Sequence, residues 1–83
     1  MTALQLYQEV ALTREIPEHR LQAGDIATLV DFLAHPDGGE EGCVLEVFNA
    51  IGESVAVVAV PLSAVESLRS DEILTVRAFP QAS

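Results

Sequence analysis

Apolar and polar positions alternate along several short runs of this chain. In the first run, Gln8–Arg14, Val10 and Leu12 point one way and the residues between them the other. A period of two is typical of β-strands, because successive side chains point to opposite faces. Four later runs rich in β-branched, aromatic or other apolar residues predict further strands: Ile26–Ala34, Cys43–Asn49, Ser54–Val60 and Ile73–Ala78.

The segments between these runs predict the connections. Pro17–Asp25 forms a long first loop, which Gly24 and Asp25 close before the second strand. Residues 35–42 are dense in turn residues, and Asn49–Glu53 predicts a tight hairpin. Pro61 begins a 3₁₀ or one-turn helical segment before the last strand.

Together these elements predict an all-β fold, a small five-stranded SH3-like (KOW-type) barrel. The chain of 83 residues is long enough for one such domain, residues 1–83. One alternating face of each strand is expected to form the core. The predicted core residues are Val10, Leu12, Ile26, Val30, Phe32, Leu45, Val47, Val55, Val57, Ile73 and Val76.

Two of the predicted strands carry more apolar residues than a small barrel needs. In Ile26–Ala34 and Ser54–Val60 both alternating faces are apolar, although the outer face of such strands is normally polar. The outer apolar stripe then consists of Leu29, Leu33 and Val58. Three explanations remain open: the N-terminal segment covers the stripe, a second copy pairs with it, or it binds a partner protein.

The charge of the chain narrows the class of partner. Thirteen Asp and Glu residues face four Arg and no Lys, which gives a net charge of −9. This charge repels nucleic acids and anionic membranes and favours a basic protein. The acidic loop residues Asp37, Glu40 and Glu41 are therefore the second part of the candidate partner-binding site. Without a membrane-length apolar run or signal-peptide features, the protein is expected to be soluble and cytoplasmic.

Two stretches, "LYQEVALTREIPEHRLQAGDIATLVDFL" and "EVFNAIGESVAVVAVPLSAV", resemble an uncharacterised bacterial family of short proteins, the domain-of-unknown-function family DUF4926. The resemblance extends from Leu6 to about Leu68. The Gly-Asp pair followed by Thr-Leu-Val also resembles other SH3-like modules, such as translation-factor KOW domains, although Ala27 stands where those often carry glycine. The resemblance implies a fold rather than a reaction. It also suggests that the protein is an antitoxin-like partner of a neighbouring gene's product.

Candidate chemical groups are few. His19, His35 and Cys43 lack the close spacing of a zinc site. A Cys43–His35 nucleophile pair has no oxyanion-hole motif beside it. We therefore expect no catalytic, metal or cofactor site. The sequence predicts a non-catalytic acidic protein-interaction module that binds a basic protein, as an antitoxin-like inhibitor or accessory subunit. The alternative is a KOW-type nucleic-acid or ribosome-associated factor, which the fold permits and the charge disfavours.

Overall fold

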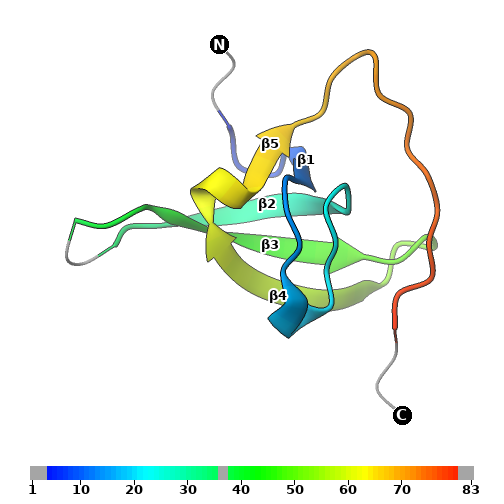
Figure 1. Ribbon diagram of the computed structural model, residues 1–83, viewed down its shortest axis with the longest axis horizontal. Coiled ribbons are helices and arrows are strands. Elements are labelled where there is room, and N and C mark those ends of the chain that lie inside the picture. The colour runs from blue at the N-terminus through cyan, green and yellow to red at the C-terminus, as the bar shows by residue number, and fades with distance from the viewer. Residues whose placement is uncertain (1–3, 36–37, 81–83) are drawn as a thin grey trace.

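A computed structural model describes residues 4–35 and 38–80 and contains one antiparallel sheet (Figure 1). Its strands are β1 (Glu9–Leu12), β2 (Ile26–Leu33), β3 (Gly42–Phe48), β4 (Ser54–Pro61) and β5 (Val65–Ser67). Two 3₁₀ turns, η1 (Pro17–His19) and η2 (Leu62–Ala64), are the only helical elements of the described residues. The predicted all-β class is confirmed.

The strand order of the sheet is β4-β3-β2-β1-β5. The number of strands, the first four strands, the long first loop, the tight connection between β3 and β4 and the 3₁₀ turn before the last strand are as predicted. The sheet is not closed into a barrel, because no pairing joins β4 to β5 within the described parts of the chain. Both strands are therefore edges of an open sheet.

The last strand lies earlier in the chain than predicted. Val65–Ser67 pairs with β1, whereas the predicted strand Ile73–Ala78 is extended and joins no strand. The Thr13 N–H donates to the carbonyl of Ala64 at 2.8 Å, so the chain leaves η2 already beside β1. Residues 65–67 therefore occupy the edge of β1, and the later segment does not pair with it. Ile73 and Val76 are consequently almost fully exposed, not core residues.

The predicted faces of β2 and β4 are inverted. Leu29 lies opposite Leu45, and Leu45 lies opposite Val58. Cross-strand partners share a face of the sheet, so all three point inward. Leu29 is 0% exposed and Val58 is 5% exposed, whereas Val57 is 62% exposed. The prediction that Leu29 and Val58 belong to an outer stripe is wrong, since both belong to the core.

The remaining predicted core residues are buried on β1 and β3 but not on β2 and β4. Val10, Leu12, Leu45 and Val47 are buried as predicted. Phe32 and Val55 are exposed, and Ile26 and Val30 are only partly buried. Register irregularities between Leu29 and Asp31 and between Val47 and Phe48 add one residue to β2 and to β4. An added residue shifts the alternation of faces, which a strict period of two cannot anticipate.

The long first loop supplies part of the core. Ile16 and Leu21 form an isolated bridge in which each backbone N–H donates to the other's carbonyl, and both side chains are buried. Arg20, between them, adopts a left-handed conformation with φ of 60°. Among the described residues, the buried core cluster is Val10, Leu12, Ile16, Leu21, Ala27, Leu29, Cys43, Leu45, Val47, Val58, Val60, Ala64 and Val65.

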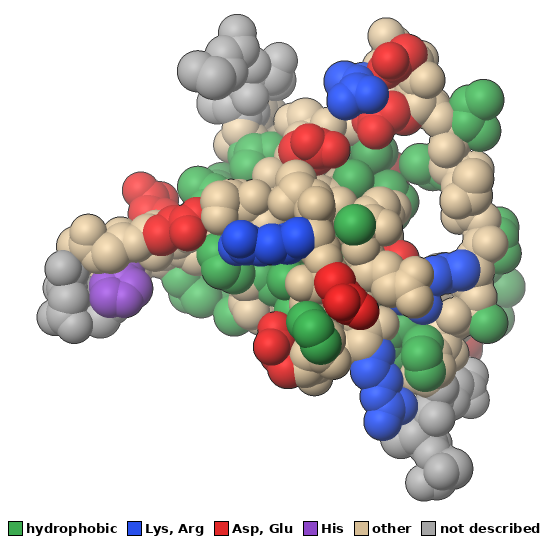
Figure 2. All heavy atoms as spheres, in the orientation of Figure 1, with side chains coloured by type: hydrophobic (Ala, Val, Ile, Leu, Met, Phe, Trp, Pro, Cys, Tyr) green, Lys and Arg blue, Asp and Glu red, His purple; other side chains and the backbone are tan. Residues whose placement is uncertain are grey.

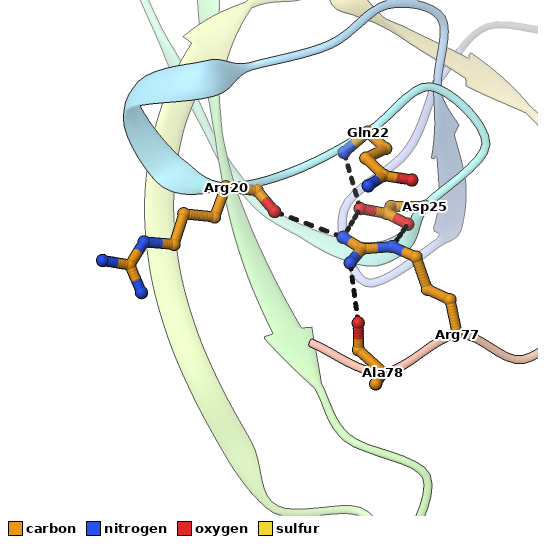
Figure 3. Close-up of polar contacts among 5 residues, drawn as sticks. All are labelled: Arg20, Gln22, Asp25, Arg77 and Ala78. Atoms are coloured by element: carbon orange, nitrogen blue, oxygen red, sulfur yellow. Dashed lines mark hydrogen bonds and ion pairs between the residues drawn. The ribbon is translucent and has the colours of Figure 1, made fainter. Parts of the chain in front are cut away.

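An ion pair fastens the C-terminal segment to the end of this loop (Figure 3). The Arg77 Nε donates to Asp25 Oδ1 at 2.8 Å, and its Nη2 donates to the second carboxylate oxygen and to the carbonyl of Arg20. Partial burial raises the pKa of Asp25, but hydrogen bonds from Arg77 and the Gln22 N–H outweigh it. The pKa of this carboxyl is therefore below its ordinary value. The extended segment is thus held to the sheet domain by a side-chain contact rather than by strand pairing.

We expect Asp25→Asn to lower the free energy of unfolding by about 1 kcal/mol at pH 7, as for a partly exposed charged pair. Folding lowers the pKa of the Asp25 carboxyl. The charged pair therefore stabilises the fold fully above the unfolded-state pKa of about 4. This stabilisation is lost as the pH falls through the folded-state pKa. The difference between the variant and wild type should therefore shrink towards pH 3. Urea unfolding at both pH values measures it.

Asp71→Asn is the matched control, because the Asp71–Arg69 pair is mostly exposed. This variant should change the free energy of unfolding by less than about 0.5 kcal/mol. An Asp25→Asn effect that is equal at pH 7 and pH 3 would contradict the electrostatic explanation.

Candidate functional site

A shallow groove lies at the base of the β2–β3 hairpin, beside the end of β4. Its volume is about 540 Å³. Apolar atoms form most of its lining, which consists of Leu33, Ala34, His35, Glu40, Gly42, Ala59, Val60 and Pro61. We call this surface the hairpin groove. Figure 2 shows acidic side chains along the hairpin where it projects from the sheet.

The predicted partner-binding residues do not all meet at the hairpin groove. Leu33 and Glu40 line it, and the exposed Glu41 follows Glu40 in the chain. Asp37 lies outside the described residues. Leu29 and Val58 are in the core and cannot contact a partner in the folded protein. The structure thus brings Glu40 together with Leu33 but removes the two buried apolar residues from the predicted site.

Glu40 fixes one wall of the hairpin groove. Its Oε2 accepts a hydrogen bond from the Ser63 N–H at 2.8 Å, and the Glu41 carbonyl accepts one from Leu62 at 2.9 Å. Hydrogen bonds from Ser63, together with the nearby positive charge of Arg14, lower the pKa of the Glu40 carboxyl. The hairpin is therefore tied to η2, and Glu40 has a structural role. The Glu41 side chain is exposed.

The surface charge of β2, β3 and β4 has one sign. Residues 21–68 contain no Lys or Arg. In the described residues, the ion pairs are Asp25–Arg77 and Asp71–Arg69, and neither acid belongs to these strands or their connections. The acids between residues 26 and 61 are Asp31, Asp37, Glu40, Glu41, Glu46 and Glu53. This half of the molecule therefore has a negative surface potential, which Arg14 offsets only near Glu40.

Sequence reasoning missed the apolar residues that are actually outside. Val57 and Ala59 on β4 are exposed and lie opposite Glu46 and Val44 of β3. The residue that indicates the outer face of β4 is Glu46. A charged residue on β3 favours the solvent side, and its cross-strand partner must share that side. The Asn49–Glu53 hairpin alone would place Ala56 opposite Glu46, and the extra residue in β4 places Val57 there instead.

Cys43 and His35, the two candidate reactive residues, differ in exposure to solvent. The Cys43 side chain is fully buried, and burial raises the pKa of its thiol. The His35 ring is exposed, and its Nδ1 accepts a hydrogen bond from the Gly39 N–H at 3.2 Å. A buried, protonated thiol is a poor nucleophile. Over residues 4–35 and 38–80, no three His, Cys, Asp or Glu side chains gather as metal ligands.

The described part of the chain has no helix long and apolar enough to span a bilayer. Its class is a small acidic all-β protein with an open five-stranded sheet. The chain belongs to the family described as Domain of unknown function (DUF4926), whose model matches residues 6–73. Neither the curated proteins nor the solved structures contain a match to it. The predicted family is confirmed, and most of the extended C-terminal segment follows the matched region.

Proposed function

We propose that this protein is a non-catalytic acidic interaction module that binds a basic protein. The observation that carries the proposal is the charge of the β2–β4 half, which displays carboxylates over a stretch of 48 residues, 21–68, without Lys or Arg. Such a surface attracts cationic partners and repels phosphate backbones. It therefore favours a protein partner over the nucleic acid that a KOW-type factor would bind.

The exposed apolar residues beside these carboxylates supply the other requirement of an interface. Leu33 and Val57 are exposed, and the hairpin groove is mainly apolar. Protein interfaces combine an apolar centre with a charged rim, and the rim mainly determines orientation and association rate. A module of this kind acts by covering a basic surface of its partner. An antitoxin-like inhibitor and an accessory subunit both work in that way.

The test compares two charge reversals in the full-length protein. Glu41→Lys changes an exposed carboxylate next to Glu40 of the hairpin groove, and Glu18→Lys changes an exposed carboxylate on η1. Immobilised wild type and both variants are incubated with an extract of the source organism, and captured proteins are identified by mass spectrometry. We expect wild type and Glu18→Lys to capture the same basic protein. Glu41→Lys should bind it about tenfold more weakly, which corresponds to about 1.4 kcal/mol.

Retention on a heparin column separates the two functional classes. Wild type should pass through at about physiological salt, where the Debye length is roughly 8 Å. Salt-dependent retention, or captured RNA in place of a protein, would overturn the proposal in favour of a nucleic-acid factor.

A further inference from the structure

β4 is an exposed edge of the open sheet. It pairs with β3 on one side, and in the described residues no strand pairs with its other side. Its eight residues, Ser54–Pro61, include no charged side chain. The opposite edge, β5, has only three residues, of which Glu66 is charged. Long apolar edges without charge readily pair with another strand, so β4 is the edge suited to strand addition.

The backbone groups available on β4 follow from its pairing with β3. The Leu62 N–H donates to the Glu41 carbonyl, immediately beyond the Gly42–Pro61 pair. Hydrogen-bonded and non-hydrogen-bonded pairs alternate in an antiparallel ladder. The pairs of Val58 and Val60 with β3 are therefore hydrogen-bonded. The pairs that contain Val57 and Ala59 are not hydrogen-bonded. The N–H and C=O groups of these two residues therefore point away from β3.

Two observations agree with this assignment. Pro61 occupies the next outward-pointing position, and proline, which has no N–H, is tolerated on strands where the missing donor would face the free edge. Outside the strand ladders, no backbone hydrogen bond in the described residues involves Val57 or Ala59. Residues 57–59 therefore present an unpaired strand edge to a partner.

The charges around β4 select the kind of strand that can join it. Glu53 precedes β4, Glu41 flanks the opposite end of the strand, and Glu46 lies beside Val57. Pairing of β4 with β4 of a second copy about a two-fold axis would bring Glu53 of one copy near Glu41 of the other. Like charges in this arrangement repel. A basic strand is attracted by the same carboxylates.

We propose that a basic, extended segment of the partner protein adds to β4 as a sixth strand of the sheet. The proposal rests on the proposed function and specifies its binding mode. On the inner face, apolar side chains of the added strand extend the core beside Val58 and Val60. On the outer face, Arg or Lys side chains pass over Val57 towards Glu46, which is two strand spacings, about 10 Å, away. The partner segment thus alternates apolar and basic residues.

The test uses a synthetic peptide and a substitution that removes the outward N–H of one β4 residue. The peptide is an acetylated and amidated strand of about eight residues in which valine and arginine alternate; the control peptide alternates valine and glutamate. Ala59→Pro removes an N–H that β3 does not use, whereas Ala59→Ser keeps that N–H. Calorimetry measures binding to the full-length proteins, and circular dichroism with thermal unfolding shows that each variant is folded.

We expect the valine–arginine peptide to bind wild type and Ala59→Ser with affinities within about twofold, and Ala59→Pro at least about tenfold more weakly. The valine–glutamate peptide should not bind. A second measurement needs no variant: amide hydrogen exchange at Val57 and Ala59 of wild type should slow when the valine–arginine peptide is added, because these N–H groups become hydrogen-bonded.

Several results would overturn the strand addition. Equal binding by Ala59→Pro and Ala59→Ser is one, and unchanged exchange at both amides is another. A wild-type dimer that Ala59→Pro converts to monomer would identify a second copy as the occupant. If binding survives Ala59→Pro but is lost in Glu41→Lys, the edge proposal fails while the proposed function stands. Equal binding of the two peptides would contradict both proposals.

Discussion

Val58→Asp is expected to unfold the protein, whereas the same change at the neighbouring Val57 leaves it folded. Val58 belongs to the core cluster and lies opposite Leu45, which is fully buried. An aspartate there would be desolvated without a partner, at a cost of several kcal/mol. The total stability expected for 83 residues is only about 4–12 kcal/mol.

Val57 provides the matched comparison because it is on the same strand, has the same side chain and is mostly exposed. Val57→Asp should cost about 1–2 kcal/mol, from the range of strand propensities together with the like charge of Glu46 opposite it. Circular dichroism and urea unfolding of both variants measure the difference. A cooperative Val58→Asp together with an unfolded Val57→Asp would mean that β4 presents its other face to the core.

Leu21→Ala is expected to lower the free energy of unfolding by about 2–5 kcal/mol, although Leu21 lies in a loop. The side chain is 1% exposed and is one of the largest fully buried groups. Its truncation leaves a cavity under the first loop, and the bridge to Ile16 restricts the collapse that could fill it.

Leu74→Ala is the control for the same chemical change, because Leu74 on the extended C-terminal segment is 59% exposed. It should change the free energy of unfolding by less than about 0.5 kcal/mol. Chemical denaturation of the two variants under identical conditions provides the comparison. A small effect of Leu21→Ala would show that the first loop does not close the core.

The candidate site was predictable where its residues are near in sequence. Glu40 and Glu41 are adjacent, and the turn residues before them place both on the β2–β3 hairpin. Leu33 ends the strand that leads into the same hairpin. Their part in partner binding remains a prediction. Leu29 and Val58 depended instead on which face of a strand points inward. With apolar residues on both faces, burial energy alone hardly separates the two registers.

The fifth strand was mispredicted for a different reason. Residues 73–78 have the β-branched, apolar composition of a strand, but a strand also needs an edge to pair with. The 3₁₀ turn η2 places Val65 directly beside β1, so Val65–Ser67 rather than residues 73–78 pairs with β1. Local composition therefore indicates strand propensity, but the connection from η2 determines which segment lies beside β1.

The sequence by itself determined the features that depend on local chemistry. Alternation defined four of the strands, turn residues defined their connections, and the list of charges defined the acidic character of the surface. Only the tertiary structure decided which faces of β2 and β4 are buried, that the sheet stays open, and that the first loop enters the core. These features depend on pairing between segments distant in the chain. Cross-strand partners share a face, so the register with β3 determines burial where the alternation of one strand is ambiguous.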